Sequence, residues 1–419
     1  NIDYLNYYND NPSDFTLENY DASGEFIDGE DIGITKTTPI DILVGAVDYS
    51  NSKNEKLKWE LGFKETLTWF TNDVAVQYFR DGQWEYDPEL TNESWLDENI
   101  TAVYGSANWQ MTEKTGITGG LRYEYLNSVL DTEKEKGIVD LHYGKLFPTF
   151  YVSQKLNKNN TVQFSYSKRI DRPTFNELAP FVTFVTPETF VAGNENLLPA
   201  MSNIFRIDYQ LKSYILSFSY TTTDNSISRF QPVYSEDGER QYFISKNMDK
   251  SENISALLAL PITVTDWWKM QNSISWVWQR LATDYEGTDI DYKQNYYNIS
   301  SNQSFTINKQ FSAEISGFYR SKSLAGIFVQ KPLGRLDLGV QWRSKSQNSR
   351  LNLNISDVFK TQLLKREAHI PELNIDNYYE LDFEPRVLRL TFTHNFGNKA
   401  IKIRERNTAS EEEQKRVTN

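Results

Sequence analysis

The segment at residues 378–396 constrains the fold of this chain most, because its second half alternates strictly between apolar and polar residues. The alternating positions are Leu388, Arg389, Leu390, Thr391, Phe392 and Thr393. A period of two indicates a β-strand with one apolar and one polar face. We interpret all nineteen residues as one strand, far longer than the usual ~5–6 residues of a globular strand. Long two-faced strands suit a transmembrane barrel, which presents apolar side chains to lipid and polar ones to a wet lumen.

The same alternation recurs along the whole chain. With the closing segment, about sixteen strands are predicted, the others at residues 1–8, 43–49, 57–63, 100–104, 117–125, 146–152, 162–166, 205–211, 214–220, 254–260, 274–278, 297–307, 311–319, 336–342 and 351–355. If the sheet closes, the last strand must pair with the first, which in this chain is the short stretch 1–8.

Long and short connections alternate between these strands. The long ones are residues 9–40, 71–97, 128–143, 169–200, 231–240, 284–291, 321–333 and 360–377. The short ones are residues 50–55, 112–116, 157–160, 212–213, 261–266, 308–310 and 344–349. This is the pattern of an up-and-down antiparallel outer-membrane barrel, with long loops outside the cell and short turns in the periplasm. A soluble propeller or stacked sandwich is the alternative, but such folds have shorter strands and no systematic loop asymmetry.

Composition narrows the class of function further. The 419 residues include no cysteine, three histidines and 59 aromatic residues, and the net charge is −13. The absence of cysteine excludes disulfides and cysteine-ligated metals, and the acidic balance argues against a nucleic-acid partner. The histidines, His142, His369 and His394, are far apart and lie in no catalytic motif. We therefore predict a protein that is not an enzyme and uses no cofactor or metal.

Four stretches carry a resemblance to a known family. They are FSYSKRIDRPTFNELAPF (164–181), GNENLLPAMSN (193–203), LNLNISDVF (351–359) and FEPRVLRLTFTHNFG (383–397). In sequence, order and spacing they resemble the outer-membrane β-barrel family of Bacteroidota that is related to TonB-dependent receptors. The resemblance implies the C-terminal portion of a barrel of about 22 strands. It also implies a plug domain, a TonB box and roughly six earlier strands that these residues do not contain.

We predict a domain plan and consider three possible functions. Residues 1–397 would form the barrel in the outer membrane, and residues 398–419 a flexible periplasmic tail. The first function is import of a bulky nutrient, with TonB engaged through a plug domain. The second is a membrane-anchored scaffold in a larger envelope complex, contacting a surface lipoprotein or other envelope proteins. The third is an unplugged channel that resembles a porin.

The candidate ligand-binding residues lie in the long connection 169–200, which family likeness places outside the cell. They are Arg169, Asp171, Arg172, Asn176 and Asn194. The three charged residues lie where a strand leaves the membrane, and Pro173 after them ends its ladder because proline has no N–H group to donate. The alternative, which we favour, is that the charged residues pair with one another and brace the connection, as charged clusters usually do.

Charged residues of the closing segment and two acidic runs have structural interpretations as well. Glu384, Arg386 and Arg389 are predicted to face the lumen, and we favour an internal ion pair between Glu384 and Arg386 over a binding role. The acidic runs at residues 21–31 and 284–291 supply oxygen ligands of the kind that Ca²⁺ prefers. Neither run has EF-hand spacing, and a solvated acidic loop is the favoured interpretation.

Overall fold

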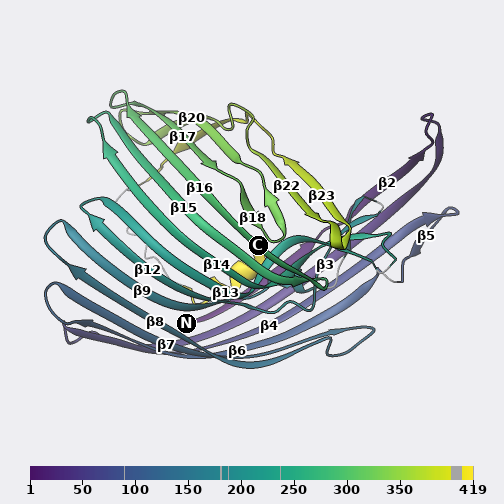
Figure 1. Ribbon diagram of the computed structural model, residues 1–419, viewed down its shortest axis with the longest axis horizontal. Helices are drawn as coiled ribbons and strands as arrows, with labels where there is room; N and C mark the ends of the chain where they lie inside the picture. The colour runs from purple at the N-terminus through teal and green to yellow at the C-terminus, as the bar shows by residue number, and fades with distance from the viewer. Residues whose placement is uncertain (89, 180–181, 187, 236, 398–407, 419) are drawn as a thin grey trace.

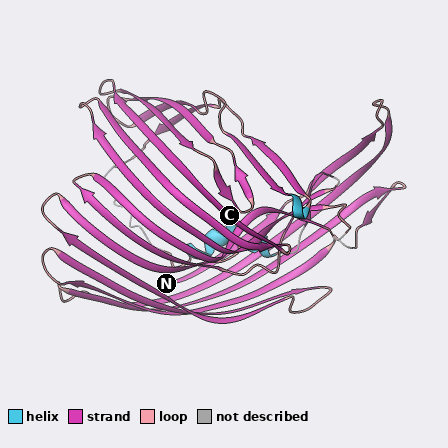
Figure 2. Ribbon diagram, viewed as in Figure 1, coloured by secondary structure: helices cyan, strands magenta, loops and turns pink. Residues whose placement is uncertain are grey.

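One curved sheet of long antiparallel strands dominates the structure, a computed structural model that describes residues 1–88, 90–179, 182–186, 188–235, 237–397 and 408–418. Almost all of the chain is strand, with only a few short helical segments (Figure 2). The predicted all-β, antiparallel class is confirmed. Among the described residues, no helix is long and apolar enough to cross a bilayer.

The wall of the barrel is a series of consecutive antiparallel ladders (Figure 1). In order, its strands are β1 (Ile2–Asp10) and β2 (Ser13–Tyr20), which both pair with β3 (Phe26–Asn51), then β4 (Leu57–Arg80), β6 (Asn92–Gln110), β7 (Thr115–Thr132), β8 (Val139–Lys155), β9 (Asn160–Asp171), β12 (Ala200–Leu211), β13 (Tyr214–Tyr234), β14 (Gln241–Thr263), β15 (Trp268–Tyr285), β16 (Thr288–Thr306), β17 (Phe311–Arg320), β20 (Leu333–Arg343), β21 (Ser349–Ile355) and β24 (Leu388–His394). Counting β1 and β2 as one interrupted strand gives the predicted number of about sixteen. No ladder joins β24 to β1 or β2 within the described part of the chain.

The smaller elements all belong to the long connections. They are β5 (Gln83–Tyr86), α1 (Phe175–Leu178), β10 (Val182–Thr186), β11 (Thr189–Ala192), β18 (Ser323–Ala325), β19 (Phe328–Gln330), β22 (Leu363–Ile370), η1 (Pro371–Leu373) and β23 (Ile375–Asp382), with α2 (Glu411–Thr418) near the end of the chain. The strands β18, β19, β22 and β23 form a second sheet of their own. The wall ends joined by short turns therefore differ from the opposite ends, where these elements gather, as the alternation of connections predicts.

Apolar side chains of neighbouring wall strands are aligned across the ladders on the outer face. On β15, Ile274 stands opposite Leu258 of β14 and Ile299 of β16. Ile274 and Ile299 are 44% and 45% exposed, so the protein itself does not cover them. Such a band is stable against hydrocarbon and unfavourable against water, as a transmembrane barrel requires.

We predicted that the closing segment is one continuous strand, and this prediction is wrong. Its first part, β23, pairs with β22 in the second sheet, and only β24 joins the wall. Pro385 lies between the two strands and offers no N–H group to a ladder. Arg386 follows with a φ of 56°, a left-handed conformation that reverses an extended chain. These two residues explain why alternation on both sides does not produce one strand.

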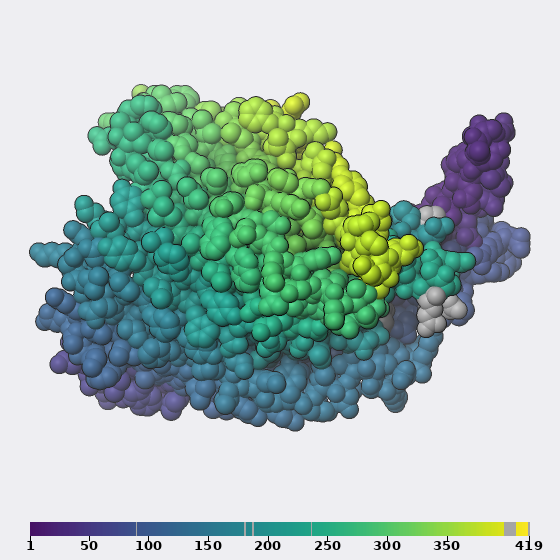
Figure 3. All heavy atoms as spheres, in the orientation of Figure 1, coloured from purple at the N-terminus to yellow at the C-terminus, as the bar shows by residue number. Residues whose placement is uncertain are grey.

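Two long connections that we predicted as loops are strands instead. Residues 9–40 form the end of β1, all of β2 and half of β3, and residues 71–97 hold the ends of β4 and β6 with β5 between them. Acidic residues hid the alternation, but Ile32 and Ile34 of β3 are buried between them. The hairpins β2–β3 and β4–β5 project beyond the body of the molecule, upper right in Figure 3. Strands that leave the membrane need no apolar outer face, so the two-faced pattern fades there.

The outer apolar band predicts opposite outcomes for adjacent substitutions. We expect Ile274→Arg to destabilise the barrel by about 2–4 kcal/mol if the site lies near the bilayer centre. Ser275→Arg serves as the control, since this neighbour points to the other face of β15. Urea titration in detergent, followed by tryptophan fluorescence, measures both variants. Equal destabilisation by the two substitutions would contradict the assignment of faces.

Candidate functional site

A cavity with charged walls lies on the concave side of the sheet and has a volume of about 520 Å³. We call it the lumen cavity. Eight basic and four acidic side chains line it, together with uncharged residues; the charged ones are Lys64, Arg122, Glu124, Lys168, Arg169, Asp171, Arg172, Arg229, Glu412, Glu413, Lys415 and Arg416. The first six come from the wall strands β4, β7 and β9, Arg172 directly follows β9, Arg229 is on β13, and the last four come from α2. An excess of positive charge makes this cavity a candidate site for an anionic group.

The connection between β9 and β12 folds inward and forms one side of the cavity. Its helix α1 begins with a capping box: the backbone N–H of Glu177 donates to Thr174 Oγ1 over 3.2 Å, and the N–H of Thr174 donates to Glu177 Oε2 over 2.8 Å. Phe175 stacks on Phe70 of β4, with 5.6 Å between ring centroids. Where the connection returns past α1, Gly193 lies so close to the carbonyl of Ala179 that any side chain would clash.

Glu177 anchors this connection to the wall beyond its role in the cap. Its carboxylate accepts from Arg229 Nε over 2.7 Å and from Ser245 Oγ over 3.0 Å. Burial opposes ionisation of Glu177, but the hydrogen bond from Thr174 and the charge of Arg229 outweigh it and lower the pKa of the carboxyl group. The carboxylate therefore remains charged and holds α1 in place at neutral pH.

A buried charge cluster fixes the end of β9. Glu124 of β7 accepts hydrogen bonds from both Arg122 and Arg172, and the side chains of Glu124 and Arg172 are only 7% and 13% exposed. The Nε atom of Arg172 has no hydrogen-bond partner among the described residues. A buried charge is tolerated only when it is paired, so Glu124 is the group that allows Arg172 to lie here.

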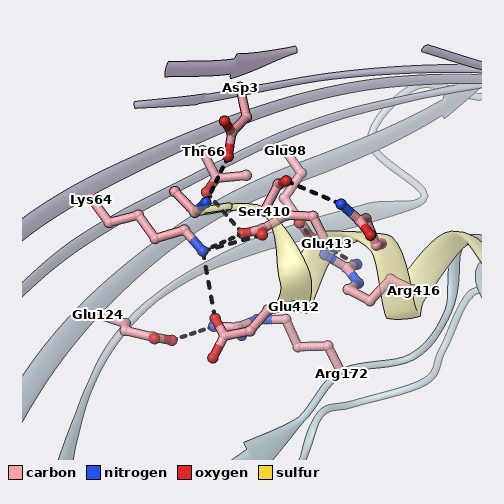
Figure 4. Close-up of polar contacts among 12 residues, drawn as sticks. Asp3, Lys64, Thr66, Glu98, Glu124, Arg172, Ser410, Glu412, Glu413 and Arg416 are labelled. Atoms are coloured by element: carbon pink, nitrogen blue, oxygen red, sulfur yellow. Dashed lines mark hydrogen bonds and ion pairs between the residues drawn. The ribbon is translucent and has the colours of Figure 1, made fainter. Parts of the chain in front are cut away.

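The other side of the lumen cavity is formed by residues 408–418, which we call the C-terminal segment (Figure 4). The backbone N–H of Ala409 donates to Asp3 over 2.6 Å, and Ser410 is fully buried. Lys64 Nζ lies 2.9 and 3.1 Å from the two carboxylate oxygens of Glu413, and Thr66 donates to the same group over 3.0 Å.

One helical turn further on, Arg416 makes a second set of wall contacts. It pairs through two nitrogens with the carboxylate of Glu98 on β6, and its Nε donates to the carbonyl of Pro173 over 3.2 Å. Its guanidinium also lies 4.3 Å from the ring centroid of Phe175. We predicted a flexible tail for residues 398–419. Residues 408–418 instead contact the wall, and residues 398–407 lie outside the described residues.

A local signal for this helix is present in the sequence and was missed. Ser410 precedes three glutamates and is followed by Lys415 and Arg416. A serine before acidic residues starts helices well, and basic residues in the last turn complement the helix dipole. The absence of an apolar period concealed the helix, because charges rather than apolar residues supply most of its wall contacts.

The structure separates the five candidate ligand-binding residues into two groups. Arg169, Asp171 and Arg172 line the lumen cavity. Asn176 and Asn194 do not. Asn176 accepts a hydrogen bond from Lys36 over 3.3 Å, and the side-chain amide of Asn194 donates to the carbonyl of Ser245 over 2.9 Å. These two asparagines brace the connection. Lys64, Thr66 and Glu98 line or border the cavity and were not singled out from the sequence.

The three charged residues of the closing segment have different positions. Glu384 and Arg386 lie in the connection between β23 and β24, not in the wall strand where we predicted them. Arg386 donates to the carbonyl of Val358 over 3.1 Å, and no ion pair joins it to Glu384 in the described structure. Arg389 is on β24 opposite Asn354, on the face that Leu388 and Leu390 do not occupy.

The acidic side chains of both runs are largely exposed, as we expected, but the runs form hairpins rather than loops. Residues 21–31 include the turn and the outgoing strand of the β2–β3 hairpin, and residues 284–291 form the β15–β16 hairpin. Within the residues described, no three histidine or acidic side chains converge as metal ligands.

Comparison with known proteins places this architecture. The model of the outer membrane protein beta-barrel family matches residues 1–394. The chain belongs to this family. No curated protein is significantly similar in sequence. The outer apolar band of this family member is therefore its lipid-facing surface in the outer membrane.

Solved structures share the fold at low identity. The ferric yersiniabactin uptake receptor FyuA of Yersinia pestis is 11% identical with a TM-score of 0.55, over 80% of this chain and 51% of the receptor. The ferric-catecholate import receptor Fiu of E. coli K12 is 15% identical with a TM-score of 0.53, over 88% and 55%. The copper transporter OprC is 12% identical with a TM-score of 0.57, over 86% and 56%. The chain thus spans about half the length of these proteins.

The buried charge cluster predicts a non-additive pair of substitutions. Glu124→Gln leaves Arg172 buried without its partner, which we expect to cost about 3–5 kcal/mol. Adding Arg172→Met should restore much of that loss, because an uncharged side chain needs no partner. Urea unfolding in detergent measures both variants, with Lys168→Met as a control that lines the cavity but has no ion pair in the described residues. Additive losses in the double variant would contradict the pairing.

Proposed function

We propose that this chain is the barrel of a transporter related to TonB-dependent receptors, which imports a bulky nutrient across the outer membrane. The observation that carries the proposal is the lumen cavity with its excess of positive charge, inside a barrel that has the fold of uptake receptors. In this proposal the chain supplies part of a barrel of about 22 strands, and a plug domain elsewhere in the protein contacts TonB. The motifs of the resemblance also point to a Bacteroidota source.

In the proposed orientation the long connections lie outside the cell and the short turns and the end of β24 in the periplasm. The projecting hairpins then form the outer rim that meets the nutrient first. The lumen cavity lies further in, between the rim and the short turns. The process requires binding and conformational release, and no covalent step is assigned to any residue.

Arg169 is the cavity residue best placed to contact a ligand. It is exposed at the end of β9 and has no ion pair or side-chain hydrogen bond among the described residues. Arg172, in contrast, is held by Glu124, and its role is to position the connection. Asp171 lines the cavity next to Arg169 and supplies an acceptor for donor groups of the ligand. We therefore assign capture to Arg169 and Asp171 and bracing to Arg172, Asn176 and Asn194.

A specific observation supports the scaffold function as a second candidate. The projecting β2–β3 and β4–β5 hairpins expose large aromatic side chains: Tyr20, Phe26, Trp84 and Tyr86 are 48–63% exposed. Exposed aromatic residues are enriched where proteins associate. A surface lipoprotein or another envelope protein would be the partner. The scaffold function requires no transport, which allows the two candidates to be separated.

Transport predicts a nutrient-specific growth defect that depends on TonB. We expect deletion of the gene to abolish growth on one limiting nutrient in a panel, and loss of TonB to have the same effect. The wild-type gene supplied in trans should restore growth in the deletion strain only while TonB is present. A protein that merely anchors a complex would show no such TonB dependence, and that result would overturn the import proposal.

Arg169→Ala tests the assignment of ligand capture. We expect uptake of the nutrient found in the panel to fall by about tenfold or more, since a charged hydrogen bond contributes roughly 1.5–3 kcal/mol. The amount of folded protein in the outer membrane should be unchanged, because Arg169 has no partner to lose. The control Asn194→Ala should instead lower the amount of folded protein and leave uptake per molecule intact. Unchanged uptake by Arg169→Ala would remove this residue from the site.

A further inference from the structure

The C-terminal segment contacts wall elements that are far apart in the sequence. It contacts Asp3 of β1, Lys64 and Thr66 of β4, Glu98 of β6 and the start of the β9–β12 connection. Ala409 and Val417 also pack against the apolar cluster of the inner wall. These contacts bury Ser410 completely and Glu413 to 7% exposure. The wall therefore provides a shaped and chemically specific surface for this segment.

The charges of the wall and of the segment are complementary in order and spacing. Glu413 and Arg416 are three residues apart, so they lie on one face of α2. On the wall, Lys64 of β4 receives the carboxylate and Glu98 of β6 receives the guanidinium. One turn of α2 thus places the negative Glu413 against the positive Lys64 and the positive Arg416 against the negative Glu98.

The two wall charges have no other described ion-pair partners. Lys64 pairs with Glu412 and Glu413, and Glu98 pairs with Arg416, and these are the ion pairs that the described residues give them. The side chains of Lys64 and Glu98 are nevertheless only 10% and 4% exposed. A buried charge is tolerated only when it is paired, so the docked segment supplies the charge of opposite sign that each of these two groups needs.

The segment reaches this surface from inside the barrel. The wall strand before it, β24, ends at His394 opposite Ser349, beside the short turn at residues 344–348. Lys64 lies seven residues along β4 from its short-turn end at Leu57, about 23 Å at the rise of an extended strand. Residues 408–418 therefore lie inside the lumen, away from the short turns.

We propose that the inner wall at Lys64, Thr66 and Glu98 is a peptide-binding site and that the C-terminal segment is its resident ligand. The segment acts as an internal stopper, held by two charge pairs and a cation–π contact. The ligand class is a short helical peptide with a carboxylate and a guanidinium one turn apart. This proposal does not depend on nutrient import, because it concerns a site that the segment occupies in any functional context.

A peptide of residues 408–419 tests the site directly. We expect a fluorescein-labelled peptide to bind saturably to the protein truncated after residue 407, in detergent, and not to the intact protein, whose own segment fills the site. Glu413→Gln in the peptide should weaken binding by roughly 10–100-fold, since it removes a charged hydrogen-bond acceptor. Glu411→Gln removes the same charge at an exposed position and should change binding little.

The matched substitutions on the wall are Lys64→Met, which should abolish tight binding, and Lys168→Met, which should not. Equal weakening by Glu413→Gln and Glu411→Gln would show a non-specific charge effect and overturn the proposal. So would the absence of saturable binding to a truncated protein that retains a folded barrel by circular dichroism.

Cross-linking in the intact chain provides a test that needs no truncation. The chain contains no cysteine, so pairs can be introduced freely. We expect Asp3→Cys with Ala409→Cys to be joined by a short bifunctional maleimide in isolated outer membranes. The control pair, Asp3→Cys with Glu411→Cys, has an exposed second position and should react far less. No cross-link in the first pair, or equal cross-linking in both, would contradict the docked position of the segment.

Discussion

Inside a bilayer, every backbone N–H and C=O group must find a hydrogen-bond partner within the protein. The rest of the structure depends on this requirement. Lipid offers no hydrogen bonds, so a chain that spans it as strands must pair each strand on both sides. The long uninterrupted ladders between β4 and β6 or between β15 and β16 satisfy this need residue by residue. Because pairing fixes register, it also fixes which side chains face lipid and which face the lumen. The position of every charged group in the lumen follows from this alternation.

The lumen wall near α1 is itself apolar, which determines how its charges behave. Ile42 and Val44 of β3 are fully buried, and Phe70 and Leu96 continue the same surface. Charges next to such a surface are poorly hydrated, so each needs a partner of opposite sign. This explains why Glu124, Glu177 and Glu98 are all ion-paired, whereas Arg169 at the more open end of the cavity remains available. The same physical setting thus produces both the braces and the candidate ligand contact.

The sequence predicted the membrane-spanning part of the fold, because the two solvents of a barrel wall impose the alternation that pattern analysis detects. Beyond the membrane no lipid requires this alternation, and we therefore predicted loops for the strands at residues 9–40 and 71–97. The strand that we predicted for the closing segment was too long, because Pro385 and Arg386 break the strand without disturbing the alternation around them. The pairs at the site were not predictable, because Lys64 and Glu413 are 349 positions apart. They come together only because strand register directs Lys64 into the lumen and residues 408–418 lie there as well.

The two helices in the lumen differ in how they are retained. The helix α1 is attached to wall strands at both ends and is locked by its capping box and by Glu177, so it cannot leave without disrupting the β9–β12 connection. The segment with α2 follows one wall strand only, and it is held by charge pairs with Lys64 and Glu98. Its departure would leave Lys64 and Glu98 without these ion pairs on a poorly hydrated wall, which is unfavourable unless another group replaces it. Phe175, which stacks on Phe70 and supports Arg416, links the permanent helix to the exchangeable one. A ligand that displaces the segment must therefore match its charges, and the fixed helix provides the surface against which that match is made.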